Sequence, residues 1–124
     1  YLRTRDAAKF GQLLLDDGSW IGERLVSSEW LAASLTPRTA MAWANPGQWD
    51  WQVSGYGYQW WRLQSADHEY DAMLGHGGQT IALLDEFDMV IVAIGDPFWL
   101  ADGWKYGKQL KNLVADFIAS LPSE

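Results

Sequence analysis

The chain contains no cysteine, which excludes disulfide bonds and thiolate chemistry but leaves its cellular compartment open. It also has no run of about 18 apolar residues, so we expect no membrane-spanning helix. Basic residues are scarce, because nine Lys and Arg stand against sixteen Asp and Glu and leave a net charge of −7. This balance repels phosphate groups and makes nucleic acid an unfavourable partner.

The chain does contain enough apolar material for a core. Hydrophobic residues make up 48% of its 124 residues and charged residues 20%, which is typical of one globular domain and not of a disordered segment. Its nine tryptophans are either core anchors or ligand-stacking walls. The chain starts at Tyr1 and has no signal-like segment, so we expect it to be a piece of a longer protein.

The N-terminal part has a helical pattern. Apolar residues recur at helical spacing between Thr4, a candidate N-cap, and a stop near Gly18. A second helix is expected over about Ser28–Leu35, opened by a serine cap and closed by Pro37. Residues 38–55 keep no period, and we interpret them as a long loop. The tryptophans of this loop are Trp43, Trp49 and Trp51.

From residue 56 onward the pattern indicates strands and a final helix. We expect strands over 56–64, 68–74, 79–85 and 88–95, with the last two forming an antiparallel hairpin through Asp85-Glu86-Phe87. Residues 103–121 form an amphipathic helix that can cover one face of the sheet. The fold class is therefore α+β, an antiparallel sheet of three to four strands with this helix and two N-terminal helices. We expect a single segment, 1–124, made of a helical part (1–37), the loop (38–55) and the sheet with its helix (56–124).

The stretch MLGHGGQTIALL, residues 73–84, carries the main candidate for chemistry. Gly77 and Gly78 have no side chains, so a ligand can come close to the backbone there. The backbone N–H of Gln79 could then point at a developing oxyanion, and His76 could exchange a proton near neutral pH. On the local string alone, a glycine bulge beside a surface histidine is the simpler explanation.

A second group of polar side chains lies in ADHEYD, residues 66–71. These residue types can bind a metal. A strand, however, places Asp67, Glu69 and Asp71 on one face and His68 on the other. The pattern therefore favours a solvated hairpin end, and no metal site or cofactor is expected from any part of the chain.

Aromatic residues cluster in the expected strand 56–64. Alternation places Tyr56, Tyr58 and Trp60 on one face of that strand and Trp61 on the other. One set can line a pocket or stack against a sugar, and at least one set is expected to join the core.

A complete catalytic set is missing from these 124 residues. There is no Gly-x-Ser-x-Gly, no Ser-x-x-Lys, no His-Glu-x-x-His and no phosphate-binding glycine loop. If the chain belongs to an enzyme, part of the machinery lies outside this sequence.

Three strings in order nevertheless resemble a known family. They are LRTRDAAKFGQLLLDDGSWIGERLVSSEWL, GYGYQWW and GHGGQTIALLDEFDMVIVAIGD, followed by the amphipathic helix. The set resembles the C-terminal portion of the serine β-lactamase-like hydrolases, which include class C β-lactamases, DD-peptidases, related esterases and 6-aminohexanoate-dimer hydrolases. The resemblance covers most of the chain and implies a partial β-lactamase/transpeptidase-like fold.

The resemblance also implies roles for particular residues. Such enzymes carry Ser-x-x-Lys with the nucleophile and a base, Tyr-x-Asn, and a Lys/His-Thr/Ser/Gly-Gly motif on a strand beside the site. His76-Gly77-Gly78 matches the third motif, and the first two would lie upstream. His76 would then orient the tyrosine hydroxyl or hold an anionic group of the substrate. The Gln79 N–H would be one oxyanion-hole donor. The pocket rim would be formed by Tyr56, Tyr58 and Trp60.

One position departs from many relatives. Gly77 stands where a threonine or serine hydroxyl would bind a substrate carboxylate, and a histidine is largely neutral at pH 7, unlike lysine. We therefore expect acyl transfer through an acyl-serine on neutral esters or amides in preference to β-lactams, with this chain inactive by itself.

Two other hypotheses stay open. The chain could be a stand-alone, Trp-rich binding module, for example for glycans, and exposed coplanar tryptophans on the sheet would favour this. It could also associate with itself to cover faces and edges that a longer protein would cover.

Overall fold

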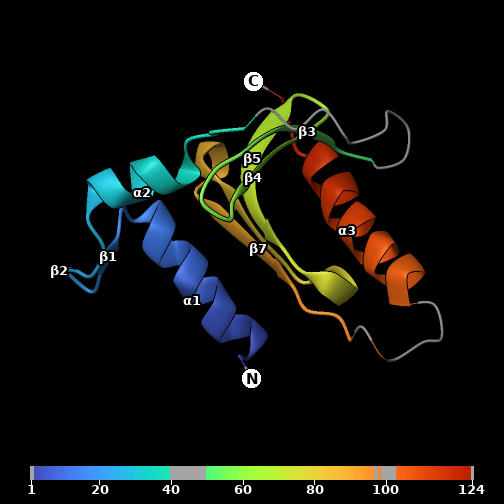
Figure 1. Cartoon of the computed structure of the whole chain (residues 1–124), viewed down its shortest axis with the longest axis horizontal. Coiled ribbons are helices and arrows are strands. Elements are labelled where there is room, and N and C mark those ends of the chain that lie inside the picture. Colours follow the sequence, from blue (N-terminus) through green and yellow to red (C-terminus); the bar gives the residue numbers. More distant parts are fainter. Residues whose placement is uncertain (1, 40–49, 97, 99–102, 124) are drawn as a thin grey trace.

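The computed structural model describes residues 2–39, 50–96, 98 and 103–123. Figure 1 shows a twisted sheet with α1 and α2 on one side and α3 on the other. In chain order the elements are α1 (Thr4–Leu15), β1 (Ser19–Trp20), β2 (Glu23–Arg24), α2 (Ser28–Leu35), β3 (Gln52–Tyr56), β4 (Trp61–Ser65), β5 (His68–Leu74), the 3₁₀ turn η1 (His76–Gly78), β6 (Thr80–Leu84), the 3₁₀ turn η2 (Asp85–Phe87), β7 (Met89–Ala93) and α3 (Gly103–Ala119). None of the described helices is both long and apolar enough to cross a bilayer.

The main sheet has five antiparallel strands in the order β3-β4-β5-β6-β7, and β1 and β2 form a separate hairpin. The predicted α+β class is therefore confirmed, with helices on both faces of an antiparallel sheet. The predicted strand 68–74 coincides with β5, and β6 and β7 form the predicted hairpin through Asp85–Phe87. The sheet has one more strand than the upper predicted number.

The additional strand arises because the predicted strand 56–64 is two strands. β3 ends at Tyr56 and β4 begins at Trp61. Between them the chain turns: the Gly57 N–H donates to the Trp60 carbonyl at 2.8 Å, and Gln59 has a left-handed φ of 69°. The aromatic run concealed this turn because Tyr and Trp favour strands on either side of it. β3 also occupies the end of the predicted loop 38–55, whereas Trp43 and Trp49 lie outside the described residues.

The two N-terminal helices begin differently. α2 has the predicted serine cap, because the Ser27 hydroxyl accepts a hydrogen bond from the Trp30 N–H at 3.2 Å. The predicted cap at Thr4 is wrong by one position. Thr4 is the first helical residue of α1, and Arg3 stands at the N-cap without a side-chain bond. The first turn of α1 therefore starts without side-chain capping.

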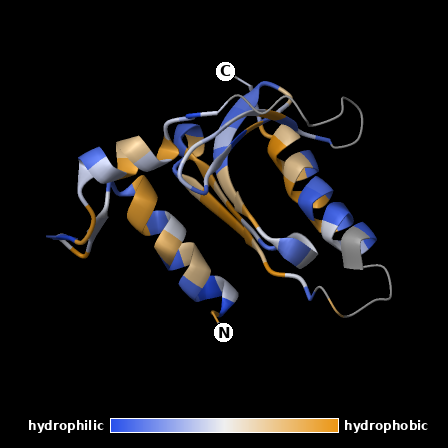
Figure 2. Cartoon of the chain, in the orientation of Figure 1, coloured by the Kyte–Doolittle hydropathy of each residue, from blue (hydrophilic) through white to orange (hydrophobic). Residues whose placement is uncertain are grey.

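Each face of the sheet has its own core. On the α3 side, Val114 and Ile118 pack against inward residues of β4 to β6. On the other side, Leu14 of α1 and Leu31 of α2 pack with Leu83 and with other residues of that cluster. Figure 2 shows hydrophobic strands running between α1 and α3. α1 approaches the sheet closely, because a Cβ on Gly11 would lie 2.4 Å from a methyl group of Val90.

A buried histidine of β5 forms a hydrogen bond with the chain just beyond α3. His68 is 2% exposed, with its Nδ1 2.7 Å from Glu86 Oε1 and its Nε2 3.2 Å from the Leu121 carbonyl oxygen. Only a protonated imidazole carries an N–H for both acceptors. Burial lowers the pKa of His68, but the bonds to the Leu121 carbonyl and the Glu86 carboxylate outweigh it, and the pKa is raised overall. The prediction of a solvated hairpin end is thus wrong for this residue.

We expect the free energy of unfolding to fall as the pH rises through the raised pKa of folded His68. Folded His68 holds its proton more tightly than the unfolded chain does. Its contribution is therefore complete below the ordinary histidine pKa of about 6.5 and is lost above the folded pKa. Urea unfolding between about pH 6 and 9 measures this dependence. Glu86→Gln should flatten it, and Gln64→Ala, at an exposed site on β4, should not. A flat wild-type profile would contradict the assignment.

Candidate active site

The predicted motif forms a tight turn at one end of the sheet. His76, Gly77 and Gly78 make up η1 between β5 and β6, and the Gly75 N–H closes the turn by donating to the Gln79 carbonyl at 2.8 Å. Gly77 and Gly78 have φ values of 78° and 89°, in the left-handed region that favours glycine. His76 is exposed and both glycines are buried. The histidine of the turn is therefore open to solvent, whereas its two glycines are not.

The structure gives the two glycines a neighbour that the sequence did not reveal. A Cβ on Gly78 would lie 2.9 Å from Leu110 Cβ, and a Cβ on Gly107 would lie 3.0 Å from the Gly78 nitrogen. A Cβ on Gly95 would also lie 2.1 Å from the Gly77 carbonyl oxygen. The glycines thus let α3 pack directly on the turn. The prediction that they also let a substrate come close stays a prediction.

Gln79 links the turn to the end of β7. Its side-chain Nε2 donates to the Gly95 carbonyl at 2.5 Å. Its carbonyl accepts the bond from Gly75. The prediction that its N–H faces a ligand stays a prediction.

The three predicted rim residues have three different environments. Tyr56 is half-buried and packs against Trp61 with ring centroids 4.6 Å apart. Tyr58 is 44% exposed and stacks on Trp30 of α2. Trp60 is 5% exposed and belongs to the core under α1 and α2. The predicted common face is wrong, because the alternation of a strand does not continue through the 57–60 turn.

The register nevertheless places this turn at the same end of the sheet as η1. Tyr56 pairs with Trp61, Trp61 with Ala72, and β5 then runs two residues further before η1 begins. The β3–β4 turn and the His76 turn therefore close neighbouring hairpins at one sheet end. Arg38 adds a charge to this end, since its guanidinium carbon lies 4.3 Å from the centre of the Tyr58 ring.

A polar cluster that the sequence reasoning missed lies on the face toward α1 and α2. Arg62 of β4 donates to both carboxylate oxygens of Asp71 at 2.6 and 2.8 Å, and to Glu69 at 2.9 Å. Burial raises the pKa of Asp71, and the bonds from Arg62 offset this only in part. Opposite charges directly across two strands were the available signal, but it depends on knowing the register. The described residues contain no group of three or more side chains suited to a metal ion.

Two groups of the described turn carry the predicted chemistry. The exposed imidazole of His76 can exchange a proton or bind an anionic group, and the Gln79 N–H can donate to a developing negative charge. Ser-x-x-Lys, the motif with a nucleophilic serine, is absent from the sequence.

The fold resembles a solved structure from Bacillus anthracis, a protein provisionally described as a 6-aminohexanoate-dimer hydrolase. The TM-score is 0.59 at 26% sequence identity, and the alignment covers 97% of this chain and 30% of that one. No protein-family model matches the sequence, and no curated protein matches it. The chain is thus similar to a part of a β-lactamase-like hydrolase and spans 30% of the length of that protein.

We expect Gly78→Ala to destabilise the protein by about 1–3 kcal/mol more than Gly22→Ala. Both glycines have similar left-handed φ values, 89° and 82°, so the backbone strain is matched. A Cβ on Gly78 meets Leu110, whereas a Cβ on Gly22 meets nothing within 4 Å. The free energies of unfolding in urea give the comparison. Equal losses for the two variants would mean that α3 does not press on the turn.

Proposed function

We propose that this chain is the part of a serine hydrolase that carries the third active-site motif, His76-Gly77-Gly78. The strongest support is the likeness over 97% of the chain to the Bacillus anthracis protein. The glycine turn and its exposed histidine at the end of the sheet agree with such a role. Because the chain spans 30% of that protein's length, the activity of the whole protein is part of this proposal.

In the proposed site each motif residue has one task. His76 holds an anionic group or orients the hydroxyl of a tyrosine supplied by another part of the protein. The Gln79 N–H stabilises the oxyanion that forms when serine attacks the carbonyl carbon, and the N–H of that serine is the second donor. Collapse of the tetrahedral intermediate expels the alcohol or amine, and water then releases the acyl group from serine.

The glycines and aromatic residues shape the proposed pocket. Gly77 and Gly78 keep side chains away from the reacting carbonyl while α3 supports them from behind. Tyr56 and Tyr58 form the rim at the same sheet end. Trp60, which is buried, acts from below as a support for the 57–60 turn. In this proposal Tyr56 and Tyr58 line the pocket rim. Trp60 supports the turn and does not contact the substrate.

The proposed substrates are neutral esters or amides in preference to carboxylate-bearing β-lactams. Gly77 supplies no hydroxyl for a substrate carboxylate, and the motif lacks the lysine ammonium that would attract one. The Bacillus anthracis protein is described as acting on a dimer of an amino acid, which is an amide. That description agrees with the amide option for this chain.

The alternative function, a stand-alone glycan-binding module, has less support from the described tryptophans. Trp60 is buried and Trp61 is half-buried against Tyr56. The exposed aromatic pair is Trp30 with Tyr58, and these rings stack on each other at an interplanar angle of 29°. Two rings that face each other leave less flat surface for a sugar than two coplanar rings would.

We expect the full-length protein to hydrolyse p-nitrophenyl esters more efficiently than cephalosporins. His76→Ala should lower kcat by about 100-fold, in the range typical of general acid–base groups. Gln64→Ala, at an exposed position on β4, is the control and should change kcat little. Steady-state kinetics give both comparisons. Efficient turnover of cephalosporins with poor turnover of esters would contradict the proposed substrate preference.

By itself, this chain should form no stable adduct with a fluorescent penicillin or a fluorophosphonate. The reason is that the nucleophile and base of Ser-x-x-Lys are absent from the sequence. Denaturing gel electrophoresis with fluorescence detection tests this, with a known serine hydrolase as the positive control. A labelled band that survives denaturation would refute the proposed division of the active site.

A further inference from the structure

Gln79, the residue that follows the glycine turn, is held both at its backbone and along its side chain. Its carbonyl accepts the hydrogen bond from the Gly75 N–H at 2.8 Å. A Cβ on Gly75 would lie 2.9 Å from the Gln79 Cβ and 3.2 Å from its Cγ. The aliphatic part of the Gln79 side chain therefore passes directly over the Gly75 backbone, in space that a side chain at position 75 would need.

The amide end of the same side chain reaches the segment that follows β7. The backbone pairing of β6 with β7 ends where Thr80 lies opposite Ala93. Beyond that pair, the Gln79 Nε2 donates to the Gly95 carbonyl at 2.5 Å. The side chain thus extends the junction between the two strands by one hydrogen bond after the backbone ladder has ended.

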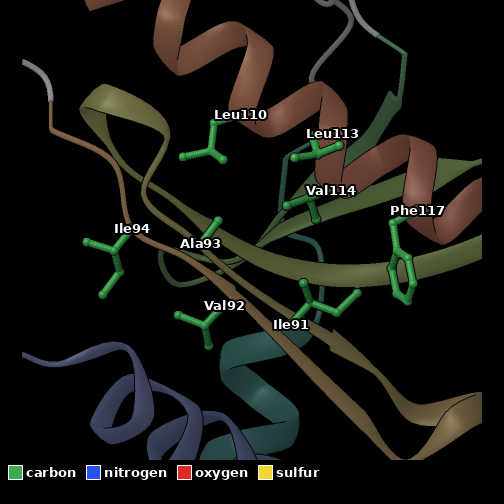
Figure 3. Close-up of a pocket in the computed structure, with 8 residues that line it drawn as sticks. All are labelled: Ile91, Val92, Ala93, Ile94, Leu110, Leu113, Val114 and Phe117. Carbon is green, nitrogen blue, oxygen red and sulfur yellow. The ribbon is translucent and has the colours of Figure 1, made fainter. Parts of the chain in front are cut away.

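Gly95, which accepts this bond, is packed between the turn and α3. A Cβ on Gly95 would lie 2.1 Å from the Gly77 carbonyl oxygen and 3.1 Å from a methyl carbon of Leu110, and Leu110 also lies against Gly78. Figure 3 shows Leu110 and Ile94, the neighbour of Gly95, on the two walls of an apolar groove of about 450 Å³ between α3 and β7. Gly95 is therefore a firm anchor for the Gln79 amide.

We propose that the Gln79 side chain is a positioning residue that fixes the direction of its own backbone N–H. This inference rests on the proposed function, in which that N–H stabilises the oxyanion. The peptide that carries it follows Gly77 and Gly78, and glycine has more backbone freedom than any other residue. With its stem on Gly75 and its amide on Gly95, the side chain restricts the rotation of this peptide.

A donor that is present but poorly aimed should reduce the rate and leave substrate binding almost unchanged. The reason is that negative charge on the oxygen develops only as the tetrahedral intermediate forms. Removal of a whole oxyanion-hole donor lowers kcat by about 100- to 1,000-fold. Loss of the positioning bond should cost part of that effect. For Gln79→Met we expect kcat to fall roughly tenfold and KM to change by less than about twofold.

Steady-state kinetics of the full-length protein with a p-nitrophenyl ester test this, with Gln79→Met and Gln79→Glu compared to the wild type. Both substitutions keep a side chain of similar length, and near pH 7 neither can donate to Gly95. Gln64→Met is the matched control. The Gln64 Nε2 also donates to a backbone carbonyl, that of Ala66 at 3.1 Å, but at the opposite end of the sheet. This control should keep the kcat and KM of the wild type.

Hydrogen exchange of the segment 75–81, followed by mass spectrometry in the same full-length proteins, gives a readout that does not need activity. We expect this segment to exchange faster in the two Gln79 variants than in the wild type and in Gln64→Met, because an unanchored turn opens more often.

Each remaining outcome contradicts one claim. An active wild type with unchanged kcat in both Gln79 variants would overturn this inference and leave the proposed function intact. A full-length wild type that neither hydrolyses esters nor reacts with a fluorophosphonate would overturn the proposed function, and with it the role of the N–H. A KM that rises as much as kcat falls, or loss of fold in both variants by circular dichroism, would mean that the side chain only holds the fold.

Discussion

The close packing of α3 on the glycine turn is the contact on which the rest of the candidate site depends. The backbones of Gly78 and Gly107 lie so close that a Cβ on either residue would clash. A Cβ on Gly78 would clash with Leu110. The turn holds two consecutive left-handed residues, a conformation that glycine adopts without strain. α3 is in turn fixed at its far end, where His68 bonds to the carbonyl of Leu121. The packing of α3 thus helps to set the position of the turn that carries His76.

The turn and the β7 edge are connected through the same elements. Gln79 follows the turn, and its side chain bonds to Gly95 just beyond β7. α3 covers the turn with its first half and borders the open groove with Leu113 and Phe117. α3 thus borders both the turn and the groove beside β7.

Much of the fold could be predicted from sequence, and the misses have physical causes. β5 and the β6–β7 hairpin were predictable because apolar strands with a short polar connection leave few alternatives. The β3–β4 turn was missed because aromatic residues favour strands on both of its sides, so Gln59 gave no visible break. The glycines at 77 and 78 predicted the approach of a ligand, which stays a prediction, and no local pattern could say that Leu110 of α3 packs beside them. The Arg62–Asp71 pair and the buried His68 depend on register and on contacts between distant segments, which periodicity does not contain.

The order of strands in the main sheet has a consequence for how the protein acquires its structure. Each strand from β3 to β7 pairs with its neighbour in the chain, so the sheet contains no crossover. Closing a short loop between two strands costs little conformational entropy, and pairing between neighbouring strands speeds folding. The meander can therefore grow as successive hairpins, and the helices can dock afterwards on faces that already exist. The turn that carries His76 lies within one of these hairpins, and its connectivity is local. Its final shape, however, also depends on α3, which follows the whole sheet in the chain.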